Sequence, residues 1–223
     1  MSPMPIQAIA FDLDGTLVDS LPDLTIAANA VRQHFELAAL PEAAIRRFVG
    51  DGAAMLVART LAGDSQATPY DHPQHALAMT VFAEAYLACV SAHTELYPGV
   101  LAALQALHAK GLPLAVITNK PLQFTEPLLQ AVGIATYFQQ VWGGDSLTEK
   151  KPSPSPLLAC AEGFGLDPAA MLMVGDSKND VLAARAAGCP VVAVDYGYAA
   201  DVDALAADQV VSSLTELLAL LPD

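Results

Sequence analysis

The chain has 223 residues, with 10 Lys and Arg against 24 Asp and Glu, which gives a formal net charge of −14 at pH 7. Hydrophobic residues make up 54% of the chain and charged residues 15%, a composition that excludes a disordered tail and supplies enough apolar chain for a large core. Such an acidic protein is not expected to bind nucleic acid or an anionic membrane surface, because both are normally bound through basic faces.

Cysteine spacing and the start of the chain indicate the compartment. The three cysteines are widely separated and no two have CxxC spacing: Cys89, Cys160 and Cys189. This argues against a disulfide framework and a thiolate zinc site, and fits a reducing environment. No basic residue precedes an apolar block at the start of the chain, so we expect no secretory signal and a cytoplasmic protein. Residues 127–144 lack charge but contain glycines and glutamines, which predicts helix, turn and strand rather than a membrane span.

The first predicted element is a strand over residues 6–11, an apolar run that ends in the polar loop 12–16 (Asp-Leu-Asp-Gly-Thr). From about residue 21 to residue 90, apolar residues recur at helical spacing. Pro41 and residues 68–73 interrupt this pattern, so we expect a small bundle of helices without strands.

After Tyr97-Pro-Gly, predicted strands alternate with predicted helices. The strands are expected at residues 114–117, 141–142, 171–174 and 191–194. The helices are expected at residues 100–109, after Pro121, and at residues 156–164 and 177–188. This alternation predicts a parallel sheet covered on both faces. The expected fold is therefore an α/β, Rossmann-like doubly wound sheet with a helical insertion directly after the first strand.

Polar residues follow four of the predicted strands at the points where they end. They are Asp12 and Asp14; Thr118, Asn119 and Lys120; Asp145, Lys150 and Lys151; and Asp176 with Asp180. Ligands of an open parallel sheet bind outside the carboxyl ends of its strands, so we expect these groups to surround one crevice.

The charges in such a crevice predict both a metal ion and an anion. Four of these carboxylates would lie close together, which is costly unless a cation lies among them: Asp12, Asp14, Asp176 and Asp180. Oxygen ligands of this kind suit Mg²⁺, which is commonly shared with a phosphate, although Mn²⁺ accepts the same ligands. Four of the ten cationic side chains fall in these loops and favour an anion there: Lys120, Lys150, Lys151 and Lys178. Together these groups predict phosphoryl transfer.

The same residues resemble the four ordered motifs of the haloacid dehalogenase-like phosphatases, over nearly the whole chain. These motifs are residues 12–16, Thr118, Lys151-Pro152, and Gly175-Asp176 with Asp180. Residues 11–20 and 48–52, and residues 144–145 followed by 150–154, resemble the phosphoglycolate phosphatase branch more closely. The resemblance implies a discontinuous α/β core of residues 1–16 and 96–223, with residues 17–95 as a helical cap that closes over the substrate.

The resemblance also implies catalytic roles. Asp12 would be the nucleophile that forms an aspartyl-phosphate, and Asp14 would protonate the leaving group and then activate water. Mg²⁺ would be held by the Asp12 carboxylate, the backbone carbonyl of Asp14 and Asp176, while Asp180 would orient a ligand or Lys151.

For the phosphoryl group itself, the resemblance implies three binding residues. Thr118 and the backbone N–H of Asn119 would bind the non-bridging oxygens. Lys151 would neutralise their charge.

Turn and cap residues are structural alternatives for several of these positions. Asp12 and Asp14 fit a turn after a strand, although two carboxylates before Gly-Thr at a buried strand end favour the functional interpretation. Thr118 and Asn119 also fit the N-cap of the following helix.

The other charged residues have alternatives as well. Asp176 and Asp180 fit an N-cap and a first-turn acid, while Lys150 and Lys178 are expected to be solvated. Three arginines of the insertion are also expected in solvent by default, although one of them near residues 50–52 fits a substrate carboxylate: Arg46, Arg47 and Arg59.

The leading hypothesis is a Mg²⁺-dependent phosphomonoesterase that converts a small phosphorylated metabolite, 2-phosphoglycolate, to glycolate and phosphate. A sugar phosphate phosphatase or a phosphomutase on the same machinery is the alternative. A dehalogenase is disfavoured because a halide leaving group needs no acid such as Asp14. A regulatory protein that kept the fold is disfavoured because every chemical position is filled. The expected partner is a small metabolite, and the protein is expected to be a monomer or a homodimer.

Overall fold

The structure is a computed structural model, and it describes residues 6–221 of the chain. The expectation about a secretory signal concerns the first five residues and lies outside the described part. No helix in the described part is long and apolar enough to cross a membrane.

A six-stranded sheet forms the centre of the fold, with every neighbouring pair of strands parallel and the order β5-β4-β1-β6-β7-β8. Its strands are β1 (Ala8–Phe11), β4 (Leu114–Ile117), β5 (Gln140–Trp142), β6 (Met171–Gly175), β7 (Val191–Val194) and β8 (Gln209–Val211). Ile9 of β1 is in register with Leu114 on one side and Leu172 on the other, so β1 is central. The parallel sheet predicted from the sequence is confirmed, with β8 as an additional strand.

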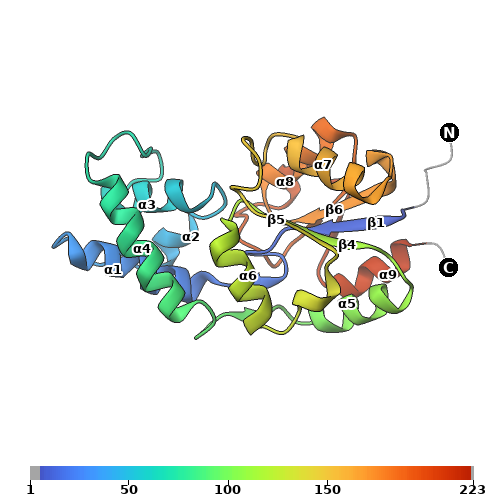
Figure 1. The fold of residues 1–223 in the computed structure, drawn as a ribbon, viewed down its shortest axis with the longest axis horizontal. Helices are drawn as coiled ribbons and strands as arrows, with labels where there is room; N and C mark the ends of the chain where they lie inside the picture. Colours follow the sequence, from blue (N-terminus) through green and yellow to red (C-terminus); the bar gives the residue numbers. More distant parts are fainter. Residues whose placement is uncertain (1–5, 222–223) are drawn as a thin grey trace.

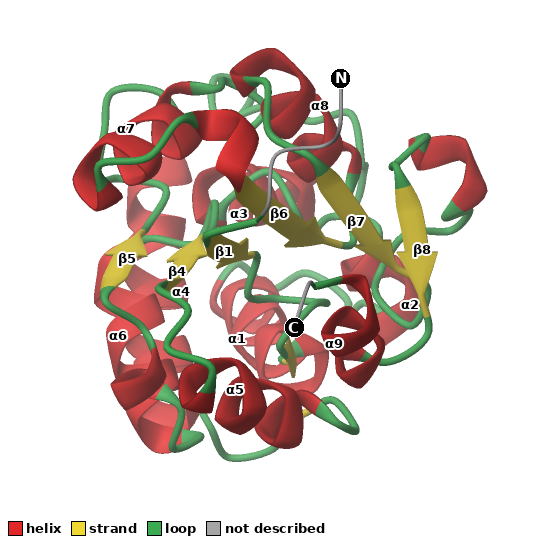
Figure 2. Ribbon diagram, turned by 90° about the vertical axis from the view of Figure 1, so that its right-hand side faces the viewer, coloured by secondary structure: helices red, strands yellow, loops and turns green. Residues whose placement is uncertain are grey.

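Helices cover both faces of this sheet, as Figure 2 shows. One face carries α5 (Val100–Ala109), α6 (Leu122–Ala131) and α9 (Leu217–Leu220), and the other carries α7 (Ser155–Phe164) and α8 (Lys178–Ala187). Alternate residues of β1 point to opposite faces of the sheet. Ile9 and Phe11 pack in the apolar core on the α5 side, and Ala8 and Ala10 pack in the core on the α7 side. Short 3-10 turns complete this part: η1 (Ala135–Tyr137), η2 (Pro168–Ala170), η3 (Asp203–Leu205) and η4 (Leu214–Glu216).

The helical insertion stands beside the sheet as a bundle of four helices (Figure 1). They are α1 (Leu21–His34), α2 (Glu42–Arg46), α3 (Ala53–Ala62) and α4 (His75–Cys89). In its core, Phe82 stacks on Tyr86 with ring centroids 5.7 Å apart. Phe124 of α6 meets both rings edge-on, at 6.0 and 5.3 Å. The bundle and the sheet layer therefore share apolar contacts through α6.

Two short strands that the sequence did not predict join the bundle to the sheet. β2 (Val18–Asp19) pairs antiparallel with β3 (Glu95–Leu96), at the two points where the chain enters and leaves the bundle. Beside this ribbon, the carboxylate of Asp23 accepts hydrogen bonds from the N–H and the hydroxyl of Thr94, at 2.9 and 2.6 Å. Both connections are thus anchored at one place.

Candidate active site

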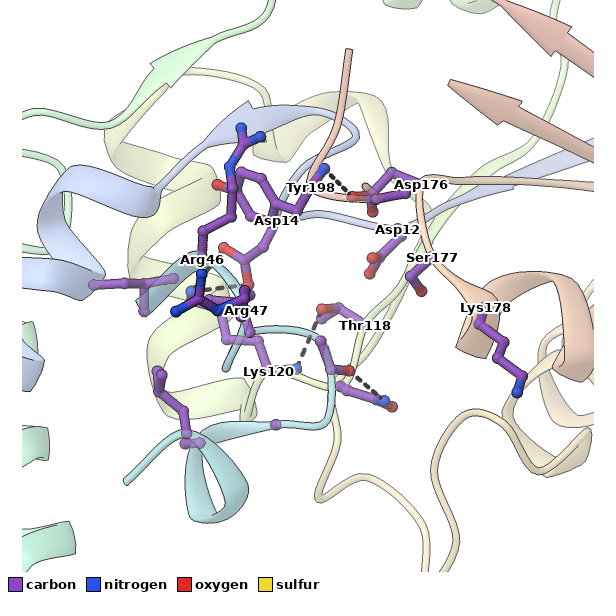
Figure 3. Close-up of a pocket in the computed structure, with 18 of the residues that line it drawn as sticks. Asp12, Asp14, Arg46, Arg47, Thr118, Lys120, Asp176, Ser177, Lys178 and Tyr198 are labelled. Atoms are coloured by element: carbon purple, nitrogen blue, oxygen red, sulfur yellow. Dashed lines mark hydrogen bonds and ion pairs between the residues drawn. The ribbon is translucent and has the colours of Figure 1, made fainter. Parts of the chain in front are cut away.

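A cavity of about 380 Å³ lies between the carboxyl ends of the central strands and the bundle (Figure 3). Residues that follow β1, β4 and β6 line one side, among them Asp12, Thr118 and Asp176. The bundle lines the other side with residues that include Arg46 and Gly52. The polar strand ends thus meet at one edge of the sheet, as the parallel topology requires.

Three buried carboxylates form the most acidic part of this site. One oxygen from each of Asp12, Asp176 and Asp180 lies within 4.8 Å of the others. Burial raises the pKa of Asp12 to about 6. Burial and the nearby Asp12 carboxylate raise the pKa of Asp176 well above its ordinary value. Among the described residues, Asp12 Oδ1 accepts no hydrogen bond, although Lys151 Nζ lies 2.9 Å away. Three carboxylates facing one ammonium retain negative charge, so this donor set fits a divalent cation.

Lys151 is held inside this group by three oxygens. Its Nζ lies 2.6 Å from Asp180 Oδ1 and donates to the carbonyl of Ile117 at 2.5 Å. Although burial opposes it, the neighbouring Asp12 and Asp180 raise the pKa of Lys151, so the side chain is an ammonium. The second oxygen of Asp180 accepts hydrogen bonds from the N–H and hydroxyl of Ser177, at 3.0 and 2.6 Å. Asp180 therefore caps α8 and positions Lys151 at the same time.

Asp176 is packed so closely that its orientation is fixed. Its Oδ2 accepts a hydrogen bond of 2.6 Å from the N–H of Tyr198. A Cβ on Gly15 would lie 2.4 Å from the same oxygen, and one on Gly197 would lie 2.3 Å from Asp176 Cβ. Gly15 also has a φ of +90°, which L side chains rarely adopt. The glycine in the Asp-Gly-Thr motif is thus required by the approach of Asp176.

Thr118 and Asn119 lie buried directly after β4. The Thr118 hydroxyl accepts a hydrogen bond from the N–H of Lys120 at 3.2 Å. The N-cap interpretation of these two residues is wrong. The N-cap of α6 is Pro121, which has no side-chain hydrogen bond, and Asp145 accepts the N–H of Leu122 instead, at 2.8 Å.

Asp14 lines the cavity but lies outside the carboxylate triad. Lys120 Nζ is 2.8 and 3.0 Å from its two oxygens, and the Ser20 hydroxyl also donates to it. The Lys120 ammonium stands 4.6 Å from the ring centroid of Tyr86, which belongs to the bundle. The sequence predicts Lys120 only as one of the lysines that favour an anion in these loops. Its place directly after Thr-Asn at a strand end was the available signal.

The loop of residues 50–52, between α2 and α3, holds the bundle to the sheet layer. Asn119 Nδ2 donates to the Gly50 carbonyl at 2.9 Å and also to the Lys151 carbonyl at 2.9 Å. Asn179 Nδ2 donates to Asp51 Oδ1 at 2.8 Å and to the Gly50 carbonyl at 3.1 Å. The loop is thus tied to residues that follow β4 and begin α8.

Two cations expected in solvent also bind this loop. Lys150 Nζ donates to the Asp51 carbonyl at 2.7 Å, and Arg59 forms an ion pair of 2.6 Å with the Asp51 carboxylate. The expectation that these two side chains are solvated is therefore wrong. Lys178 is exposed, as expected.

Comparisons with known proteins agree with this geometry. The family model described as haloacid dehalogenase-like hydrolase matches residues 6–188. A phosphoglycolate phosphatase of Chromobacterium violaceum is 48% identical over 216 residues, which cover 97% of this chain and 96% of that protein. One from Nitrosospira multiformis is 45% identical, covering 98% of this chain and 97% of the relative.

Solved structures show the same fold. The crystal structure of a predicted phosphoglycolate phosphatase from Haemophilus somnus matches with a TM-score of 0.89 and 35% identity, covering 96% of this chain and 97% of that one. The structure of CbbY from Rhodobacter sphaeroides in complex with phosphate matches with a TM-score of 0.79 and 26% identity, over 95% and 96% of the two chains.

Proposed function

This chain belongs to the haloacid dehalogenase-like hydrolase family and is a phosphoric monoester hydrolase, and we propose that it hydrolyses 2-phosphoglycolate to glycolate and phosphate. The observation that carries the proposal is the buried group of Asp12, Asp176, Asp180 and Lys151 at the base of the cavity. The name of the relatives that match almost the whole chain supports the choice of substrate.

Asp12 is the nucleophile in this proposal. Its carboxylate lines the cavity, so it can attack the phosphorus in line and form an aspartyl-phosphate. Lys151 lies 2.9 Å from that oxygen and offsets the charge of the phosphoryl oxygens. Thr118 and the backbone N–H of Asn119 bind these oxygens from the neighbouring strand end.

Asp14 serves as the acid and base. It protonates the leaving glycolate oxygen and then takes a proton from the water that hydrolyses the intermediate. Lys120 and Ser20 hold its carboxylate at the wall of the cavity. Residues 17–95 act as the cap, which excludes other water while the intermediate exists.

Mg²⁺ is the metal that we assign to this site. The Asp12 carboxylate, the Asp14 carbonyl and Asp176 would hold it, while Asp180 keeps Lys151 in place. When bound, the ion supplies positive charge that stabilises the phosphoryl group during transfer.

We propose a cytoplasmic enzyme, monomeric or homodimeric, whose partner is a freely diffusing metabolite. Its three free cysteines, Cys89, Cys160 and Cys189, suit a reducing compartment.

Phosphate release from a panel of phosphomonoesters, with and without Mg²⁺, tests this function. The panel contains 2-phosphoglycolate, sugar phosphates, nucleotides and an aryl phosphate. We expect kcat/KM for 2-phosphoglycolate to exceed the others by at least about 10-fold, and activity to vanish with a chelator and return with Mg²⁺. Equal rates across the panel, or transfer of labelled phosphate to a sugar instead of water, would overturn the assignment.

A further inference from the structure

Two arginines at the cavity differ from the other three arginines of the chain. Arg32 donates to main-chain carbonyls, Arg59 pairs with Asp51 and Arg185 pairs with Asp208. Within residues 6–221, the side chains of the remaining two donate to no protein acceptor, and both line the cavity: Arg46 and Arg47. Their charges are therefore available to a ligand.

Arg46 is the better placed of the two. It is half-buried, whereas Arg47 is exposed. Its guanidinium carbon lies 5.2 Å from the ring centroid of Tyr198, within the range of a cation–π contact. That ring is itself anchored, because the Tyr198 hydroxyl accepts the N–H of Ser20 at 2.9 Å and donates to Asp19 at 3.0 Å.

Tyr198 also links Arg46 to the group of buried carboxylates. Its backbone N–H donates to Asp176, so the same residue positions a triad carboxylate and the guanidinium. Figure 3 shows both arginines on the side of Asp14 and Tyr198, with Asp12 and Ser177 on the opposite side of the cavity. Asp12 and Arg46 line the same cavity, so a substrate whose phosphate lies at Asp12 has room to extend its other end toward Arg46.

The charges around the cavity indicate which chemical group the other end of the substrate carries. The protein carries −14, and residues 17–95 contain no lysine, so a second anion would be repelled without local compensation. Lys120 and Lys151 are already paired with aspartates. Arg46 supplies the free planar donor set that a carboxylate accepts in bidentate form.

We propose that Arg46 binds the carboxylate of the substrate and thereby selects phosphorylated carboxylic acids over other phosphomonoesters. This inference rests on the proposed function and adds the residue that sets its specificity. Arg46 binds a part of the substrate that does not react, so it contributes similarly to the ground and transition states and acts mainly on KM.

Two substrates of similar size test the inference: 2-phosphoglycolate, and 2-hydroxyethyl phosphate, which has a hydroxymethyl group in place of the carboxylate. We expect Arg46→Gln to lower the ratio of their kcat/KM values by about 10- to 100-fold, mainly through KM for 2-phosphoglycolate. Arg46→Lys keeps the charge without the planar fork and should restore part of this preference. Lys110→Gln removes one positive charge from an exposed residue that does not line the cavity, and should change the ratio by less than about threefold.

The outcomes separate the inference from the function on which it rests. An unchanged ratio in Arg46→Gln, or an equal loss in Lys110→Gln, overturns the role of Arg46 and leaves the phosphatase intact. Equal activity of the parent enzyme on both substrates also overturns the role of Arg46 and leaves the phosphatase intact. If the parent enzyme hydrolyses neither substrate with Mg²⁺, the proposed function itself fails. Thermal unfolding of each variant identifies a folding defect, and Arg46→Lys then serves as the decisive variant.

Discussion

On the sheet side of the cavity Asp12, Asp176 and Lys151 are buried and closely surrounded, whereas on the bundle side Arg46 is half-buried and Arg47 is exposed. Close packing at the glycines follows the sheet side. A Cβ on Gly15 would lie 2.4 Å from a carboxylate oxygen of Asp176, and one on Gly52 would lie 2.8 Å from the Asn119 carbonyl, where the 50–52 loop meets the sheet side. The groups that we propose to react therefore lie in closely packed surroundings, whereas the arginines that we propose to face the other end of the substrate are more exposed.

The largest expected effect comes from replacing Asp12, the residue that we propose as the nucleophile. Asp12→Asn keeps the shape of the side chain but not its charge, and should lower kcat for 2-phosphoglycolate by at least about 10⁴-fold. Asp64→Asn changes an exposed carboxylate of the bundle and should leave kcat within about twofold. Steady-state phosphate release measures both. If Asp12→Asn retained even a tenth of the activity, another residue would be the nucleophile.

Replacing Asp12 with Asn should lower the activity but raise the stability of the metal-free protein. Its pKa rises from 3.8 to about 6 on burial, so the folded state holds this proton more tightly than the unfolded state. The contribution of Asp12 to stability is therefore full below about pH 4 and is lost as the pH rises through about 6. Without metal at about pH 7.5, Asp12→Asn should be more stable than the parent protein by about 2–3 kcal/mol.

Urea unfolding at about pH 4 and 7.5, with a chelator or with Mg²⁺, measures this difference. The two proteins should converge at the lower pH, and Mg²⁺ should narrow the gap at the higher one by favouring the ionised carboxylate of the parent. A parent protein that is the more stable one at about pH 7.5 without metal would show that Lys151 already compensates the charge of Asp12.

The smallest expected effect comes from the contact between the bundle and the sheet side. Asn179→Ala removes the hydrogen bonds from α8 to Asp51 and Gly50, so the 50–52 loop should separate from the sheet layer more often. We expect kcat/KM to fall by about 3- to 10-fold, with faster hydrogen exchange in this loop. Asn29→Ala is the matched control, because Asn29 makes two hydrogen bonds to Leu40 inside the bundle only. An equal fall in both variants would mean that bundle stability, not closure, is affected.

Much of the sheet side could be predicted from the sequence because its signals are local. Apolar runs such as residues 114–117 end in polar residues, and the motif residues follow those ends directly. The two-residue strands β2 and β3 are too short to show any periodicity. The pairing of Lys120 with Asp14 joins residues 106 positions apart, and that of Asn179 with Asp51 joins residues 128 apart. Such contacts depend on how the bundle packs on the sheet, which no local pattern encodes.

The ribbon of β2 and β3 also bears on how the chain folds. β1 pairs with β4 through Ile9 and Leu114, about a hundred positions apart, so the central sheet must close a long loop. Once Val18 has paired with Leu96, the bundle lies outside that loop, and only about thirty residues remain in it. The entropic cost of joining the two strands then falls by about 1 kcal/mol. An insertion whose two ends pair with each other can therefore be long without slowing the assembly of the sheet in proportion to its length.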